Sequence, residues 1–256
     1  MNDILVITDG PAGAATRAAA ATIGRVLRCE VRDLELRRRP GEASHAAAVV
    51  DALRESSARL SVVPVESRED CLGWQVAQLC EKPIVLVPEG AREMRSVRRI
   101  LLPLDGHHDS HEAISAPLLD FVDAGVEVAV LHVFTPENTP RFWDQHAHAR
   151  VAWEDDFLGS HPLPDVDHVL LRHAARAGEQ VAEVAKSENA DLIVLGWSRR
   201  LVPGHALTVR AALRANLPVM LAPIVPTGTA GATGATRATG ATGAPAVSAP
   251  VATRRG

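Results

Sequence analysis

The sequence predicts an α/β protein with two parallel-sheet domains in tandem. Two observations lead to this prediction. Short apolar runs alternate with segments of helical period, and three of the runs occur twice in the same order. Such alternation is typical of βαβ units, in which helices cover both faces of a mainly parallel sheet. A repeat that keeps its order indicates two copies of one structural unit.

The repeat rests on three pairs of segments. They are ILVITDG at 4–10 with ILLPLDG at 100–106, ARLSVV at 58–63 with ADLIVL at 190–195, and PIVLVP at 83–88 with PVMLAP at 218–223. The second copy is longer, and nearly all of its additional residues precede ADLIVL. We therefore predict a trimmed domain over 1–91 and a complete domain over 92–225, with the boundary in the basic connector Arg92–Arg99.

Apolar runs and helical stripes place the elements inside each copy. The first copy has predicted strands at 4–8, 29–36, 60–65 and 83–87, and an Ala-rich helix at 12–27. The second has predicted strands at 99–104, 126–133, 166–172, 192–195 and 218–222. Pro117 falls inside the first helical segment of the second copy, so we expect a kink or a late helix start there, with Ser115 as the cap.

The composition changes abruptly from about Pro226. Glycine then recurs at every third position, with Arg237 in one slot of the series. A collagen helix would need abundant proline between the glycines, whereas this segment has Ala and Thr. Residues 226–256 are therefore predicted to be a disordered, low-complexity tail.

Charge and composition exclude several classes of partner. The formal net charge of the 256 residues is −4, too mild to predict nucleic acid or an anionic membrane as a partner. No apolar run approaches the roughly 18 residues of a membrane-spanning helix. The N-terminus lacks a signal-peptide pattern, and the three cysteines have no metal-ligand spacing. We expect a cytoplasmic protein.

The second copy carries an ordered set of signatures: ILLPLDG, then VAVLHV, then AGEQVAEVAKSENADLIVLGW, and finally LPVMLAP. Over residues 98–224 this order resembles the universal stress protein family. The resemblance implies Rossmann-like (adenine nucleotide alpha hydrolase-like) domains and a role in stress adaptation rather than catalysis. It also implies that two units pair through their last strands, which a tandem chain would do within itself. A homodimer of whole chains is left open.

The resemblance also gives candidate site residues. Nucleotide-binding members of the family carry Gly-x-x-Gly, nine residues, then Gly-Ser or Gly-Thr, because small residues let backbone N–H groups approach phosphate. The positions of this sequence that match the family's nucleotide site, in the loop and at the ends of earlier strands, are Asp105, Gly106, Val133, Gly196, Arg199, Gly204 and His205. Arg199 replaces the second glycine, the loop is shortened, and His205 replaces the Ser or Thr. The nucleotide site is therefore predicted to be degenerate.

Two interpretations of this altered loop stay open. Arg199, Arg200 and His205 are either solvated loop charges, in which case no cofactor is needed, or side-chain cations for ATP, AMP or another anion. In the first copy Pro64 takes the place of Gly196, and no glycine loop follows, so no nucleotide is expected there.

Catalytic and metal sites find little support. No Gly-x-Ser-x-Gly elbow, Walker loop or dinucleotide fingerprint occurs, so no catalytic residue is predicted. His107, His108, Asp109 and His111 crowd one loop, and we interpret it as a solvated turn rather than a metal site. His132 is expected to pack in the core. The predicted function is a non-enzymatic regulatory or adaptor protein of the stress response. The alternatives are an ATP or AMP sensor and, third, an adenine-nucleotide hydrolase.

Overall fold

The computed structural model describes residues 3–8, 13–35, 44–68, 70–104, 108–135, 159, 166–175, 177–199 and 205–224. Contacts divide the chain into a unit over Met1–Pro226 and a second over Thr227–Gly256. The predicted tail lies outside the described residues. Among the helices that are described, none is both long and apolar enough to cross a bilayer.

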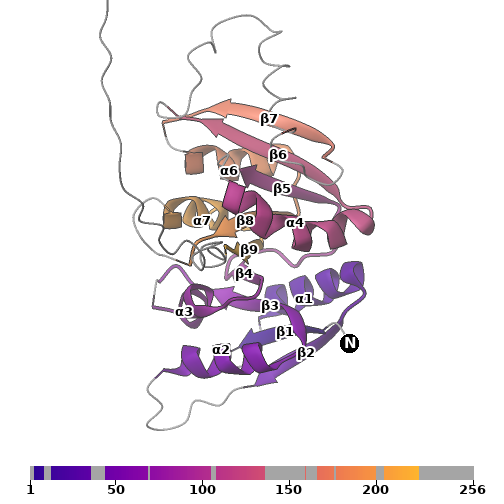
Figure 1. Cartoon of the computed structure of the whole chain (residues 1–256), viewed down its shortest axis with the longest axis vertical. Helices are drawn as coiled ribbons and strands as arrows, with labels where there is room; N and C mark the ends of the chain where they lie inside the picture. The colour runs from indigo at the N-terminus through magenta and orange to yellow at the C-terminus, as the bar shows by residue number, and fades with distance from the viewer. Residues whose placement is uncertain are drawn as a thin grey trace, which may run out of the picture. The chain divides into compact units, whose positions relative to one another are not determined.

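A single nine-stranded sheet runs through the described part of the first unit, in the order β2-β1-β3-β4-β9-β8-β5-β6-β7 (Figure 1). The strands are β1 (Asp3–Thr8), β2 (Glu30–Glu35), β3 (Ala58–Val65), β4 (Ile84–Pro88), β5 (Arg99–Leu104), β6 (Glu127–Phe134), β7 (His168–His173), β8 (Leu192–Trp197) and β9 (Val219–Pro223). Every strand predicted from an apolar run is confirmed, with ends displaced by at most two residues. We call β1–β4 the first half and β5–β9 the second half.

The internal repeat reappears in the register of the strands. Ile4 of β1 pairs with Leu60 of β3. Their counterparts, Ile100 of β5 and Leu192 of β8, pair in the same way. A register slip of one residue would turn a strand's whole apolar set to the opposite face. Equal registers therefore mean that both copies bury the same faces of their strands.

The two halves meet where β4 and β9 pair, the only antiparallel neighbours in the described sheet. Val85 lies opposite Met220, its counterpart in the repeat. In the two pairs beside it, each residue lies opposite the repeat counterpart of a residue in the other pair. This is the pattern of an interface with local two-fold symmetry. The expectation that the two units pair through their last strands within one chain agrees with this junction.

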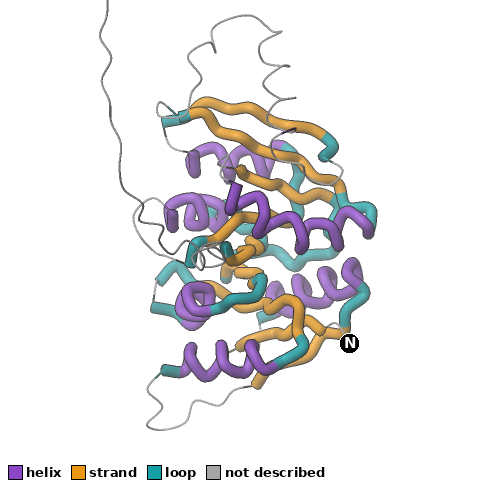
Figure 2. Tube along the Cα trace, viewed as in Figure 1, coloured by secondary structure: helices purple, strands orange, loops and turns teal. Residues whose placement is uncertain are grey.

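Helices cover both faces of the sheet (Figure 2). The described helices are α1 (Ala14–Leu27), α2 (His45–Glu55), α3 (Leu72–Leu79), α4 (His108–Asp123), α6 (Ala177–Ser187) and α7 (His205–Leu213). Buried side chains of α1 and α4 belong to one hydrophobic cluster. Those of α2, α3, α6 and α7 belong to the cluster on the opposite face. One face is thus covered by four of the described helices and the other by two.

The start of α4 differs from the sequence prediction. The helix begins at His108, so Ser115 lies inside it and is not its cap. The Ser115 hydroxyl instead donates to the His111 carbonyl oxygen at 2.8 Å, one turn back. Pro117 also lies inside the helix, where it lacks the N–H of an ordinary helical residue. The packing of Ile114, Leu118 and Phe121, all fully buried, holds this helix on the sheet despite the proline.

The basic connector between the halves is packed onto the sheet. Residues 91–98 have no regular secondary structure. Met94 and Val97 are nevertheless buried in the cluster that contains α1 and α4. The Thr22 hydroxyl on α1 donates to the Met94 carbonyl oxygen at 2.9 Å. The connector is therefore part of the core on that face.

Candidate functional site

Two of the candidate nucleotide residues, Val133 and Gly196, lie near the carboxyl ends of second-half strands. From β5 the sheet continues to β6 and β7 on one side, and to β8 and β9 on the other. The helix after β5 and the helix before β8 pack on opposite faces of the sheet. This is a topological switch point, the position where open α/β sheets bind ligands. Gly196 lies near the end of β8, on one side of β5, and Val133 lies near the end of β6, on the other side.

Gly196 has a packing role at this edge. A Cβ atom at this position would lie 3.0 Å from both Cα and Cβ of Ser110 and 3.2 Å from its carbonyl oxygen. Ser110 belongs to the first turn of α4 and is buried. The missing side chain of Gly196 therefore lets α4 approach β8 closely. That packing accounts for the glycine without any ligand.

Replacing Gly196 by alanine is expected to lower the free energy of unfolding by about 1 kcal/mol, because crowding costs more than the lower backbone entropy gains. Chemical denaturation of the full chain measures the change. Gly90→Ala is the matched control, since the nearest atom to its new Cβ would be 3.4 Å away. A neutral Gly196→Ala variant would show that α4 can move off β8 freely.

Arg199 adopts the backbone conformation of a glycine. Its φ angle is 60°, in the left-handed region that costs residues with a Cβ about 1–2 kcal/mol. Its guanidinium Nη1 lies 3.2 Å from Oε1 of Glu81, which precedes β4 in the first half. Both side chains are partly exposed, so the ion pair contributes at most about 1 kcal/mol. Arg199 thus joins the second-half loop to the first half.

Only some of the remaining candidate site residues belong to the described part of the chain. Val133 is 5% exposed and belongs to the hydrophobic cluster on the four-helix face. Asp105, Gly106, Arg200 and Gly204 lie outside the described residues. His205 opens α7, and its side chain is likewise not described. The structure therefore brings Gly196 and Val133 to one edge of the sheet and turns Arg199 toward the first half.

The histidines do not form a metal site in the described chain. No group of three or more His, Cys, Asp or Glu side chains could hold a metal among the residues searched. His107 and the side chains of His108 and Asp109 fall outside that part. His111 is buried inside α4, so the interpretation as a solvated turn is wrong for this residue. His132 is 5% exposed, its Nδ1 lies 3.1 Å from the Leu104 carbonyl oxygen, and its ring meets Phe134 edge-on. It is a packed core histidine, as predicted.

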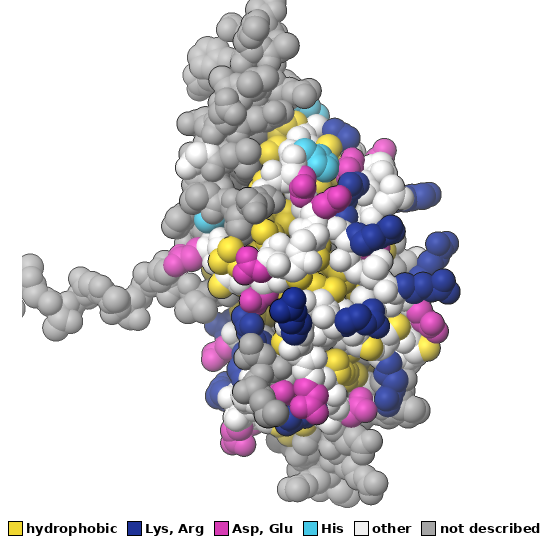
Figure 3. Space-filling view, turned by 90° about the vertical axis from the view of Figure 1, so that its right-hand side faces the viewer, with side chains coloured by type: hydrophobic (Ala, Val, Ile, Leu, Met, Phe, Trp, Pro, Cys, Tyr) yellow, Lys and Arg dark blue, Asp and Glu magenta, His cyan; other side chains and the backbone are white. Residues whose placement is uncertain are grey.

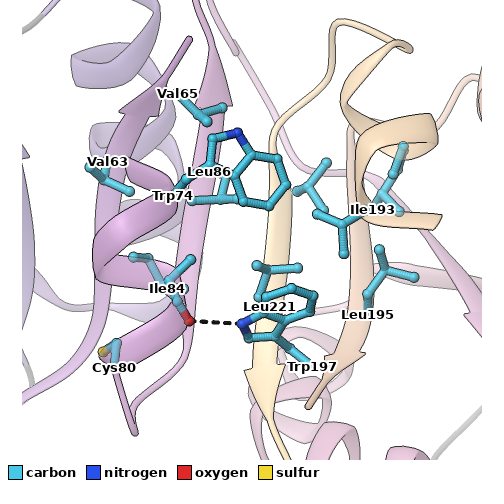
Figure 4. Packing of buried hydrophobic residues seen from close by; sticks show 14 of the residues in the cluster. Val63, Val65, Trp74, Cys80, Ile84, Leu86, Ile193, Leu195, Trp197 and Leu221 are labelled. Atoms are coloured by element: carbon cyan, nitrogen blue, oxygen red, sulfur yellow. Dashed lines mark hydrogen bonds between the residues drawn. The ribbon is translucent and has the colours of Figure 1, made fainter. Parts of the chain in front are cut away.

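Sequence reasoning missed the residue that ties the halves together most directly. Trp197, at the end of β8, is 2% exposed. Its indole Nε1 donates to the Ala77 carbonyl oxygen at 2.7 Å (Figure 4). Ala77 lies in the last turn of α3, where carbonyl groups have no partner within the helix. A second-half side chain therefore caps a first-half helix. No signal in the sequence points to this contact, because 120 residues separate Trp197 from Ala77.

The corresponding position in the first half is closed by packing. Pro64 lies near the end of β3, and Gly73 lies near the start of α3. A Cβ on Gly73 would stand 2.4 Å from the Pro64 carbonyl oxygen. The helix therefore rests directly on the strand end where a phosphate loop would otherwise begin.

This architecture is similar to that of known proteins. Residues 96–223 match the model of the Universal stress protein family. A universal stress protein from Archaeoglobus fulgidus has a similar structure, with a TM-score of 0.63 and 11% identity over 88% of this chain and 99% of that chain. A functionally unknown protein from Pseudomonas aeruginosa gives a TM-score of 0.53 and 16% identity over 87% of this chain and 92% of that chain. No curated protein matches the chain significantly.

Proposed function

The chain belongs to the universal stress protein family, and from this we propose that it is a non-enzymatic regulatory protein of the stress response with a degenerate nucleotide site. It would act by binding other proteins. We further propose a trimmed domain over 1–91 that serves as a built-in pairing partner for a complete domain over 92–225.

The observation that carries the proposal is the position of Arg199. A phosphate-binding loop uses glycine where the backbone must come close to the ligand. Here the second glycine position of the loop holds a long side chain whose guanidinium is paired with Glu81. The first glycine, Gly196, is accounted for by its contact with Ser110. Both residues serve contacts within the protein.

Surface and thiol chemistry support the compartment and the class of partner that we propose. Cys29, Cys71 and Cys80 form no disulfide, which supports a reducing compartment, and we propose the cytoplasm. On the face in Figure 3, basic side chains stand among acidic and apolar ones. Such a mixed surface, with a net charge of −4, favours a protein partner over nucleic acid.

The proposal predicts that the nucleotide-free full chain does not bind ATP or AMP up to millimolar ligand. The physical reason is that Arg199 occupies the glycine position and is already paired. Isothermal titration calorimetry measures this directly. Arg199→Gly is the informative variant: if it gains nucleotide affinity, the arginine is what blocks a site that the fold still frames.

A nucleotide sensor is the second candidate, because the strand order frames a switch point at β5 and β8. Micromolar ATP binding that Asp105→Ala abolishes and Arg199→Gly weakens would establish it and overturn the first proposal. Steady hydrolysis of ATP by the full chain would contradict a non-enzymatic role. If that hydrolysis survived Asp105→Ala, the site assignment would also be wrong.

A further inference from the structure

A pocket of about 450 Å³ lies between the two halves at one edge of the sheet. Its lining includes Val65 and Pro88, the last residues of β3 and β4, and Leu213, the last residue of α7. None of the described candidate nucleotide residues belongs to the lining. The pocket thus lies at the carboxyl ends of first-half strands, the edge at which open α/β sheets bind ligands. Its volume is within the usual range for small-molecule sites, about 300–1,000 Å³.

The local two-fold symmetry of the β4–β9 junction accounts for the space. In the repeat, Val65 at the end of β3 is the counterpart of Trp197 at the end of β8. The Trp197 indole fills the space between β8 and α3 and donates to the Ala77 carbonyl oxygen. At the end of β3 the shorter Val65 leaves the corresponding space against α7 unfilled. The protein itself therefore shows that an aromatic ring suits a space of this kind.

Trp74 of α3 offers this pocket an unused hydrogen-bond donor. Its side chain lines the pocket, although the residue is only 3% exposed. Within the part of the chain that the structure describes, the indole Nε1 of Trp74 forms no hydrogen bond. In Figure 4 this nitrogen lies on the side of the ring nearest Val65, another lining residue. A ligand that displaces water from the pocket must therefore bring an acceptor for this N–H group, because an unsatisfied buried donor is costly.

The charged side chains of the lining balance one another. They are Glu66 and Glu89, which follow β3 and β4, and Arg210 and Arg214 on α7 and just after it. An anion would gain from the two arginines, but it would also meet the two carboxylates and the C-terminal end of α7, which carries partial negative charge. A purely cationic group has only donors and would leave the Trp74 N–H without an acceptor. The lining therefore favours an uncharged molecule.

We propose that this pocket binds a small, uncharged aromatic molecule that carries a carbonyl acceptor. Its ring would lie beside Val65 and Leu213, in the space that corresponds to the position of the Trp197 indole, and its carbonyl oxygen would accept from Trp74 Nε1. The ligand would contact both halves, because the lining combines first-half strand ends with α7. The inference does not depend on whether the second half binds a nucleotide.

The test uses the full chain and benzamide, an uncharged aromatic ring with one carboxamide. The chain has four tryptophans, so its ¹H–¹⁵N correlation spectrum contains four indole N–H signals. The signals lost in Trp74→Phe and in Trp197→Phe identify the two buried indoles. We expect benzamide to shift the Trp74 signal and to slow its exchange with water at least about fivefold, in proportion to the occupied fraction. The Trp197 signal should not move, because its N–H is already bonded to Ala77. Benzoate, the same ring with a negative charge, should bind at least about tenfold more weakly.

Two pairs of variants test the site through the dissociation constant of benzamide, measured from its saturation-transfer signal. Trp74→Phe keeps the ring and removes the donor, so binding should weaken about fivefold, as expected for one lost hydrogen bond. Trp197→Phe is its matched control and should leave binding unchanged. Ser67→Trp places an indole at an exposed position of the lining and should weaken binding at least about tenfold. Leu207→Trp, on α7 away from the lining, should not.

Circular dichroism checks that the four variants fold. An unmoved Trp74 signal up to the solubility limit of benzamide would overturn the proposal. So would equal affinity for benzoate, or an equal loss of affinity in the two members of either pair of variants.

Discussion

Replacing Trp197 by alanine is expected to lower the free energy of unfolding by about 4 kcal/mol. The indole is almost fully buried and belongs to the cluster on the four-helix face. Deleting such a side chain removes its buried apolar surface and leaves a cavity that the neighbours fill only in part. It also removes the donor to the Ala77 carbonyl oxygen. The loss falls between the halves, because α3 belongs to the first and β8 to the second.

Trp197→Phe separates the two contributions. Phenylalanine keeps most of the apolar surface but has no N–H group, so the Ala77 carbonyl loses its partner. We expect a loss of about 1–2 kcal/mol from this variant, near the usual cost of an unsatisfied buried acceptor. Urea denaturation of wild type and both variants, followed by circular dichroism, gives the values. If Trp197→Ala cost less than Trp197→Phe, the indole would not hold the halves together.

Gly73→Ala should cost about 3 kcal/mol, the upper end of the range for overpacked positions. The new Cβ would lie 2.4 Å from the Pro64 carbonyl oxygen and 3.3 Å from the Pro64 carbonyl carbon. These are backbone atoms, so a rotamer change cannot relieve the contact, and α3 must move away from β3. Alanine's better helix propensity, about 1 kcal/mol over glycine, offsets only part of this cost.

The measurement for Gly73→Ala is the shift in thermal midpoint, with Gly90→Ala again as the control, which should shift little. Because α3 carries Ala77, displacement of the helix should also disturb the bond from Trp197. The double variant Gly73→Ala with Trp197→Phe should therefore lose less than the sum of the two single variants. Strict additivity would argue that α3 stays in place and that the strain is absorbed elsewhere.

Much of the fold could be predicted from the sequence because the signals are local. Strands buried on both faces in a parallel sheet read as continuous apolar runs, such as ILVIT at 4–8 and ILLPL at 100–104. The repeat then predicts that both copies pair alike, as the equal registers of Ile4 and Ile100 confirm. Local signals were weaker at helix ends. The sequence pattern around Pro117 suggested a cap at Ser115, but α4 begins at His108, and Ser110, His111 and Ile114 in its first turns are buried.

The candidate site could be predicted only in part. Gly196 is identifiable from its place after an apolar run, but its reason for being glycine lies in Ser110, far away in the sequence. Arg199 was expected to face solvent or an anion. Its partner Glu81 could not be found from spacing, since 118 residues separate the two.

The sequence by itself determined the α/β class, the duplication and the strands, because each depends on the periodicity of apolar residues along a short stretch of chain. Only the tertiary structure decided how the halves hold each other, through the Trp197–Ala77 bond and the Arg199–Glu81 pair. Both depend on the antiparallel pairing of β4 with β9, which brings together groups more than a hundred residues apart in the sequence. No local pattern encodes such contacts, because each partner, taken with its neighbours in the sequence, looks like an ordinary surface or core residue.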